Sequence, residues 1–351
     1  MKKNRYIQLI LVIAVSWLTA CENQPIEFDD YGSTACYFPY QTPARSLILG
    51  NYNLGLNEND NNHLFEIGVT MSGVYENVND RRVYFEVDES LLNGVANVVP
   101  LPPSYYAIET ASPVTIPAGS IKGRIRVQLT DAFFDDTLSL APIDSVNYVI
   151  PLVINNVEGI DTILQGVAAD GISDPVKTDP EDWAVQPKDY TLYGIKFINK
   201  YHGNYLRRGV DQLDTFNIAT SSYETDTTIV YHKDYVERDE VVMVSSSSLN
   251  AVVLSNSIRR GDLASPGDIE LLLTFDANEN CQVFDHHTSE EIGEGEFVEN
   301  GDSWGGESRD VIHMEYTFLD TINNEMHYVT DTLVMRDRAV VFEEFTIYVE
   351  D

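Results

Sequence analysis

Basic residues are scarce in this chain. Its 351 residues include 22 lysines and arginines against 56 aspartates and glutamates, which gives a formal net charge of −34 at pH 7. A protein that binds nucleic acid needs a basic surface to meet the phosphates, and docking on anionic lipid needs a similar patch. The composition therefore predicts no nucleic-acid partner and no direct docking on an anionic membrane.

Cysteine is scarce as well, with three residues, Cys21, Cys36 and Cys281. No cysteine and histidine spacing matches a zinc site, so we expect no bound metal. Cys36 and Cys281 lie far apart in the sequence. Two buried free thiols are favoured for them, and the sequence leaves a disulfide open.

Catalytic motifs are missing from the sequence. It contains neither the Gly-x-Ser-x-Gly turn of hydrolases nor the His-Glu-x-x-His pair of zinc proteases. Paired carboxylates can hydrolyse glycosidic bonds, but neighbours such as Asp135 and Asp136 are expected by chance among 56 acids. We therefore predict a protein that is not an enzyme and needs no cofactor.

The first residues of the chain have the organisation of a secretory signal. Lys2, Lys3 and Arg5 precede a mostly apolar run over residues 7–18. This run is too short for a membrane-spanning helix, which needs about 20 apolar residues. A positive start, a short apolar stretch and small residues at its end predict a signal peptide over residues 1–20.

Small residues at the end of this run lead directly into a cysteine, as Leu18-Thr19-Ala20-Cys21. The tetrapeptide resembles a bacterial lipobox, which implies cleavage before Cys21 and lipid attachment to it. The acidic residues that follow resemble the export signal of Bacteroidetes surface lipoproteins. We therefore expect a lipid-anchored protein of the outer membrane that faces the cell exterior, with a tether over residues 21–32.

The remaining sequence has the pattern of an all-β protein. Apolar and polar residues alternate over 121–129, which is typical of a half-buried strand. Prolines and acidic residues fill 172–188 and predict a stiff linker between domains at 33–171 and 189–351. Many short strands in the second domain, joined by Asn, Asp and Gly turns, predict an up-and-down barrel or a two-sheet sandwich.

The first domain carries a series of separate short motifs. They are Tyr37-Phe38-Pro39, Leu47–Gly50, Asp80-Arg81, Val87–Leu92, Leu101-Pro102, Ile116–Gly119 and Tyr148–Leu152. Together they resemble the uncharacterised N-terminal domain of Bacteroidetes surface lipoproteins. This resemblance implies an immunoglobulin-like β-sandwich. It also implies a gene location beside outer-membrane glycan importers of the SusC and SusD type.

The second domain has motifs of its own: Tyr193–Asn199, Tyr201–Gly209, Trp304–Gly306 and Asp331–Arg338. They resemble a C-terminal domain of related lipoproteins, which implies a lipocalin-like, up-and-down antiparallel β-barrel. Lipocalins begin with a Gly-x-Trp that an arginine from a late strand clamps. Gly203 and Tyr205, with Arg336 or Arg338, match these positions, with Tyr in place of Trp. The resemblance implies that these residues close the barrel.

Aromatic residues are abundant, with 20 Tyr, 14 Phe and 3 Trp. Flat rings stack on the apolar face of a sugar, while polar side chains bond its hydroxyls. Trp304 is the first candidate, because the glycines around it predict an exposed loop. Tyr201 and Tyr205 are the other candidate ligand-binding residues.

These observations favour a non-catalytic cell-surface lipoprotein that binds a glycan or supports a SusC/SusD-type polysaccharide importer. Two alternatives stay open. One is a structural or adhesive surface protein that contacts other envelope proteins. The other is a lipocalin-like carrier of a small ligand, which requires an open barrel lumen lined by apolar side chains.

Overall fold

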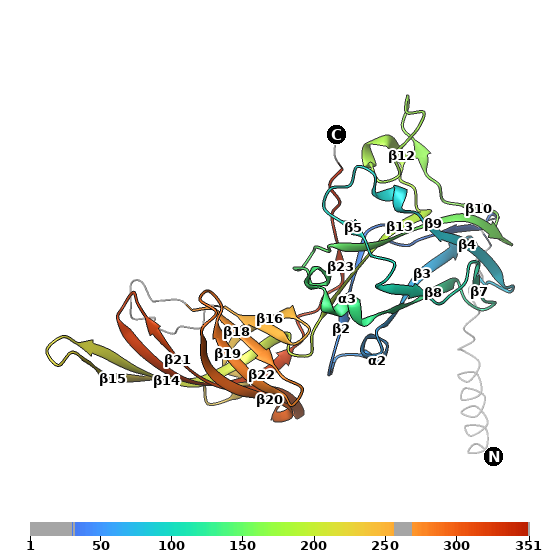
Figure 1. The fold of residues 1–351 in the computed structure, drawn as a ribbon. Helices are drawn as coiled ribbons and strands as arrows, with labels where there is room; N and C mark the ends of the chain where they lie inside the picture. Colours follow the sequence, from blue (N-terminus) through green and yellow to red (C-terminus); the bar gives the residue numbers. More distant parts are fainter. Residues whose placement is uncertain (1–29, 31, 256–268, 350–351) are drawn as a thin grey trace, which may run out of the picture.

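The computed structural model describes residues 30, 32–255 and 269–349. The predicted signal peptide, Cys21 and most of the tether lie outside the described residues. The chain is all-β and forms a sandwich followed by an elongated barrel, in agreement with the predicted fold class (Figure 1). Among the described residues, no helix has the length and hydrophobicity needed to cross a membrane.

The sandwich consists of two sheets. The first has the order β10 (Thr162–Ile163), β1 (Ala35–Tyr37), β3 (Leu64–Ser72), β8 (Lys122–Leu129) and β6 (Tyr106–Ile108). The second has the order β23 (Glu343–Glu344), β2 (Pro43–Ile48), β13 (Tyr190–Ile198), β9 (Tyr148–Glu158), β4 (Arg81–Val87) and β7 (Val114–Ile116), with β5 (Val99–Pro100) beside β9. Short helices α2 (Glu58–Asn61) and α3 (Asp131–Asp135) lie in the connections.

Alternation along β8 explains how the sandwich forms. Ile125, Val127 and Leu129 are buried, whereas Arg124 and Arg126 are exposed. The apolar side chains enter a core between the two sheets, and the opposite face of β8 meets water. The period of two in the sequence thus gives the burial of this strand.

Both described cysteines belong to such cores. Cys36 lies in the sandwich core and Cys281 in the barrel core, and both are free thiols. Burial raises the pKa of each to about 12, which leaves both thiols protonated and unreactive at neutral pH.

The domain boundary differs from the one predicted. Strand β13 lies within 189–351, yet it pairs with β2 and β9 of the sandwich. Residues 172–188 therefore lie within the connection between β9 and β13, which are neighbouring strands of one sheet. They contain β12 (Trp183–Val185), which pairs with β11 (Val167–Ala168). The alternation of β13 predicts a strand, but it does not say which sheet the strand joins.

The second domain is a closed barrel of eight antiparallel strands. They are β14 (Gly203–Asn217), β16 (Glu240–Ser248), β17 (Ala251–Leu254), β18 (Leu271–Phe275), β19 (Asn280–Asp285), β20 (Glu291–Trp304), β21 (Glu307–Asp320) and β22 (Glu325–Asp337). Pairing of β14 with β22 closes the barrel. Strand β15 (Ser222–Tyr231) pairs with the second half of β14, Gly209–Asn217. It extends the sheet beyond the closed barrel, at the left of Figure 1.

The chain crosses between the domains twice, and Arg338 holds both crossings together. The chain leaves the sandwich after β13 and returns after β22, where β23 pairs with β2. The guanidinium of Arg338 donates to the carbonyls of Leu49 and Asn51 in the sandwich at 2.9 and 2.8 Å. It also donates to the carbonyls of Asn199 and His202 at the start of the barrel, at 2.5 and 2.8 Å.

Gly203 and Arg336 complete the predicted set for barrel closure. A Cβ on Gly203 would lie 2.4 Å from the carbonyl oxygen of Asp337, so only glycine fits where β14 crosses β22. Arg336 is exposed and only approaches the neighbouring Asp337 at 3.7 Å. The structure therefore gives Arg336 no part in closing the barrel.

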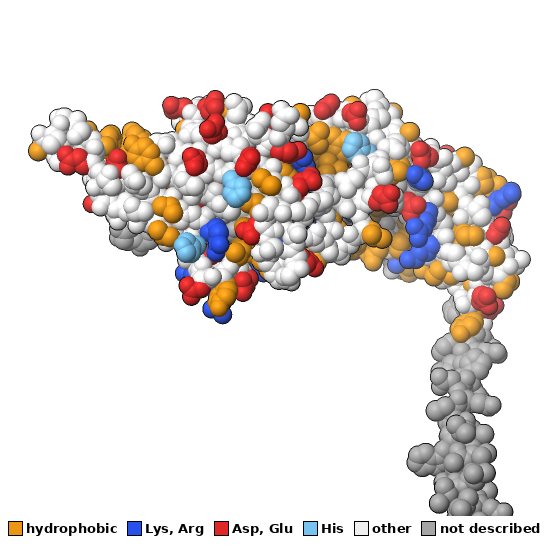
Figure 2. Space-filling model, turned by 90° about the horizontal axis from the view of Figure 1, so that it is seen from below, with side chains coloured by type: hydrophobic (Ala, Val, Ile, Leu, Met, Phe, Trp, Pro, Cys, Tyr) orange, Lys and Arg blue, Asp and Glu red, His pale blue; other side chains and the backbone are white. Residues whose placement is uncertain are grey.

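Acidic side chains are spread over both domains on the face shown in Figure 2, and the larger group of basic side chains on that face lies on the sandwich. The surface thus carries the acidic excess of the composition, with 56 acids against 22 lysines and arginines. A surface of one dominant charge favours solubility.

We expect Arg338→Met to destabilise the protein by about 3 kcal/mol, because it removes hydrogen bonds to four carbonyls, and at least two of these bonds are buried. Arg336→Met is the matched control and should change stability by less than about 0.5 kcal/mol, since its side chain is exposed. Equilibrium unfolding in urea measures both. Equal effects of the two substitutions would contradict the role given to Arg338.

Candidate functional site

The interior of the barrel is filled by its own side chains. Buried residues from its strands form one apolar cluster that includes Tyr205, Phe297, Ile312, Met314 and Leu333. Each of these side chains is at most 3% exposed. This packing is the opposite of the open apolar lumen that the small-ligand carrier requires.

Tyr201 and Tyr205 lie in this packed interior, at the end of the barrel nearest the sandwich. The Tyr201 ring stacks on Phe275 with a centroid distance of 3.8 Å, and its hydroxyl donates to Glu279 Oε2 at 2.9 Å. The Tyr205 hydroxyl donates to the carbonyl of Tyr201 at 2.7 Å. Neither ring offers a face to a sugar, so the structure gives them a packing role in place of the expected ligand-binding role.

Trp304 ends β20 and lies on the outer wall of the barrel. Its indole Nε1 donates to the carbonyl of Met335 at 3.1 Å, and the Arg309 guanidinium lies 4.4 Å from its ring. The ring also packs against a small outer cluster that includes Val311. Trp304 is thus half-buried and fixed by contacts of the chain itself, in contrast to the exposed loop expected from the sequence.

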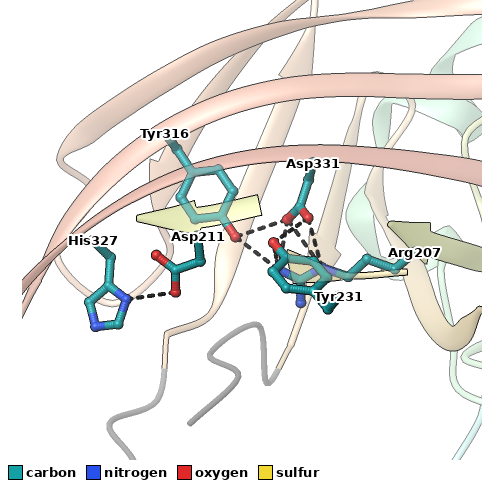
Figure 3. A network of polar contacts seen from close by, with 6 residues as sticks. All are labelled: Arg207, Asp211, Tyr231, Tyr316, His327 and Asp331. Atoms are coloured by element: carbon teal, nitrogen blue, oxygen red, sulfur yellow. Dashed lines mark hydrogen bonds and ion pairs between the residues drawn. The ribbon is translucent and has the colours of Figure 1, made fainter. Parts of the chain in front are cut away.

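A network of buried polar side chains crosses the lumen (Figure 3). Arg207 of β14 pairs with Asp331 of β22, with 2.6 Å between Nη2 and Oδ2. Asp331 also accepts hydrogen bonds from the hydroxyls of Tyr231 at 2.6 Å and Tyr316 at 3.1 Å. Both charged side chains are about 1% exposed or less. The network therefore links the two strands that close the barrel.

The protonation states of this network follow from burial and charge. Burial, together with the nearby Asp331 carboxylate, raises the pKa of both Tyr231 and Tyr316 well above the ordinary value. Burial alone would lower the pKa of Arg207, but Tyr316 and Asp331 raise it. All three partners of Asp331 thus keep their protons, which satisfies the buried carboxylate.

The outer face of the barrel wall formed by β14, β22, β21 and β20 carries exposed polar residues and the exposed ring of Tyr328. Tyr328 of β22 is 43% exposed and lies opposite Gln212 of β14 and Thr317 of β21. Two residues further along the strands, Thr330 lies opposite Glu315. These side chains line a shallow groove of about 760 Å³. The outward side chains along it are Val210, Gln212, Glu294, Glu315, Thr317, Tyr328 and Thr330.

A second cavity, of about 570 Å³, lies where the two domains meet. Hydrophobic side chains also gather at this junction on the face shown in Figure 2. Lys196 and Glu343 form a buried ion pair at its edge, with 2.6 Å between Nζ and Oε2. Lys196 Nζ donates further to the carbonyls of Pro142 and Ser145. These polar groups are therefore satisfied within the protein and hold the returning chain on the sandwich.

His202 also lines the junction cavity. Its Nδ1 accepts a hydrogen bond from the backbone N–H of Ser246 at 3.0 Å. Burial, with the nearby positive charges of Arg338 and Lys196, lowers the pKa of His202 to about 4. The ring is therefore neutral at physiological pH, as its acceptor role requires.

Sequence reasoning missed Tyr328, Arg207 and Asp331. Strand β22 contains a signal for the buried pair. Its inward and outward positions alternate, and the charged Asp331 occupies a buried position, whereas Tyr328 and Thr330 are exposed. A charge at an inward position predicts a buried partner. The partner, Arg207, lies more than a hundred residues away, and the period of the strand does not identify it.

Two domain families match the chain. The domain of unknown function DUF5627 matches residues 200–339, and a family described as an N-terminal domain matches residues 30–161. The crystal structure of a protein of unknown function from Bacteroides ovatus is similar over both domains, with 34% sequence identity and a TM-score of 0.79. The match covers 92% of this chain and 100% of that chain. No curated protein matches.

Two further crystal structures match at much lower similarity. One is an auxiliary nutrient binding protein from Bacteroides thetaiotaomicron, with 12% identity, a TM-score of 0.34 and coverage of 89% of this chain and 94% of that chain. The other is a protein of unknown function from Bacteroides ovatus, with 13% identity, a TM-score of 0.37 and coverage of 87% and 94%. These scores support no argument about fold or function.

The low pKa of His202 predicts a pH-dependent stability. As the pH falls below 6.5, the ordinary pKa of histidine, His202 becomes protonated in the unfolded chain. In the folded chain it becomes protonated only near its lowered pKa of about 4. The free energy of unfolding should therefore fall by about 3 kcal/mol from this residue across that range. His202→Asn keeps an acceptor near Nδ1 and removes this contribution.

Unfolding in urea at several pH values between 7 and 4 measures the effect. The difference in stability between the His202→Asn variant and the wild type should shift in favour of the variant as the pH falls. His287→Asn, at an exposed position, is the control and should show no such shift. A His202→Asn variant that follows the wild type at every pH would contradict the role of His202.

Proposed function

Because the chain belongs to the family of the uncharacterised Bacteroides ovatus protein and combines an N-terminal domain with a DUF5627 domain, we propose that it is a non-catalytic lipoprotein of the cell surface that binds a glycan. The proposed binding face is the outer wall of the barrel formed by β14, β22, β21 and β20. The observation that carries this proposal is the exposed ring of Tyr328 in a groove lined by polar side chains.

The chemistry of the groove suits a pyranose. The Tyr328 ring is exposed enough to stack on the apolar face of a sugar. Gln212, Thr317 and Thr330 offer donors and acceptors, and the Glu315 carboxylate accepts from hydroxyl groups. A shallow groove on a sheet leaves room for a chain of sugars to continue beyond the residues in contact.

The filled lumen supports an outer binding face over an inner one. A ligand inside the barrel would have to displace the packed ring of Tyr205 and the buried ion pair of Arg207 and Asp331. Breaking a buried pair of this kind costs several kcal/mol. A ligand on the outer wall would displace neither group, so its binding would not carry this cost.

The location at the cell surface is part of the proposal. The motif Leu18–Cys21 supports lipid attachment at Cys21, and the acidic residues after it support export to the outer face of the outer membrane. Acyl chains would tether the protein to outer-membrane lipid. The resemblance of the first domain further supports an association with a SusC/SusD-type importer.

Tyr328→Ala should weaken glycan binding about tenfold, because it removes the ring that stacks on the sugar. A glycan array with the soluble chain, starting after Cys21, identifies the ligand, and titration calorimetry with that glycan measures the affinity. Tyr75→Ala is the matched control, since Tyr75 is 62% exposed and lies on the sandwich. It should bind as tightly as the wild type.

The proposal fails if the wild type binds nothing on the array, or if Tyr328→Ala and Tyr75→Ala bind equally well. A pull-down that recovers other envelope proteins, unaffected by added glycan, would instead favour the structural or adhesive alternative. Deletion of Cys21 tests the anchor separately, because the protein should then leave the membrane fraction while the isolated chain still binds glycan.

A further inference from the structure

Three buried side chains with metal-binding atoms meet at the far end of the barrel lumen. They are Asp320 at the end of β21 and Glu325 and His327 on β22, and their ligand atoms all lie within 4.8 Å of one another. The strand pairing explains this, because Asp320 and Glu325 are the last opposed pair before the hairpin turn. Side chains two residues apart on one strand share a face, so His327 lies beside them.

The imidazole of His327 is oriented for a ligand at Nε2. Its Nδ1 lies 2.8 Å from Asp211 Oδ2 and donates a hydrogen bond to that carboxylate (Figure 3). The ring also stacks on Phe318 with a centroid distance of 4.4 Å. A carboxylate that fixes one ring nitrogen and leaves the other free is the arrangement found behind metal-bound histidines.

The remaining nitrogen, Nε2, has no hydrogen-bond partner among the described residues, and the side chain of His327 is fully buried. The nearest carboxylate atom is Glu325 Oε2 at 4.0 Å, which is too far for a hydrogen bond. An unpartnered polar atom in such a place is costly. An ion between Nε2 and the carboxylates would remove that cost.

Hydrogen bonds fix the Asp320 carboxylate. It accepts hydrogen bonds from the backbone N–H groups of Ile322 and Asn323 and from Asn323 Nδ2. Within the described residues, neither Asp320 nor Asp211 forms an ion pair with a lysine or arginine. These two carboxylates therefore bring negative charge to the end of the lumen that a cation would offset.

We propose that this end of the barrel binds one divalent transition-metal ion of the zinc class, held by His327 Nε2, Asp320 and Glu325. One imidazole and two carboxylates offset the charge of such an ion and leave a position for water. An imidazole ligand favours zinc over calcium and magnesium, which prefer oxygen ligands. Asp211 orients His327 without touching the ion.

The ion would have a structural effect on the proposed glycan-binding wall. His327 and Tyr328 are neighbours on β22, one pointing into the lumen and the other outward. Joining Asp320 of β21 to His327 of β22 fixes the hairpin that carries the outer groove. The metal site is independent of the glycan proposal, since the ion is measured with no sugar present.

Calorimetric titration of the chelator-treated, full mature chain with ZnCl₂ alone tests the proposal. The wild type should bind one ion more than His327→Gln, and that ion should raise the melting temperature of the wild type. His313→Gln is the matched control, because His313 lies on the neighbouring strand β21 and contacts Thr332. It should bind zinc as the wild type does.

Two further variants guard against loss of folding in His327→Gln, which circular dichroism would reveal. Glu325→Gln should weaken the same ion by more than about 100-fold, and Asp211→Asn by about 10- to 100-fold. The proposal is overturned if the wild type binds no zinc, if His327→Gln and His313→Gln bind the same number of ions, or if calcium binds the wild type more tightly than zinc.

Discussion

The barrel closes where β14 meets β22, and the buried ion pair between Arg207 and Asp331 lies across this seam. Burying two charges is expensive, and their attraction offsets the cost only with good geometry and further hydrogen bonds. Tyr231 and Tyr316 supply those hydrogen bonds. The seam is thereby fixed in register, because a shift of either strand by one residue would turn Arg207 or Asp331 outward and break the pair.

This seam leaves the outer wall as the accessible face of the barrel. A polar layer across the lumen, with packed aromatic rings beneath it, leaves the interior to the chain itself. The long strands β14, β21 and β22 instead present an outer surface, which β15 extends. The barrel thus shares the closed sheet of a lipocalin, while its accessible chemistry lies on the outside of the wall.

Much of the fold follows from local sequence pattern. Alternation along 121–129 gives β8 with its buried and exposed faces, and short polar turns between strands give an up-and-down barrel. Gly203 is predictable because a lipocalin-like start requires close contact with a late strand, and the structure places it against Asp337. Arg338 also lies at the end of a late strand, but its donors reach the sandwich, which no pattern within the barrel indicates.

The sequence does not show which strands pair when they lie far apart along the chain. Strand β13 has the apolar character of any buried strand, and its place in the sandwich depends on pairing with Pro43–Ile48, about 150 residues earlier. Trp304 shows the same limit for sites. Its glycine neighbours predict an exposed loop, but Arg309 and the carbonyl of Met335 hold the ring on the wall.

Period-two alternation also couples the two faces of the wall. On β22, His327 and Asp331 point into the lumen, whereas Tyr328 and Thr330 point outward. A side chain on one face cannot move far without shifting the backbone that carries the other. The inner polar groups therefore support the proposed binding surface, since a ring positioned to stack on a sugar needs a strand that does not move.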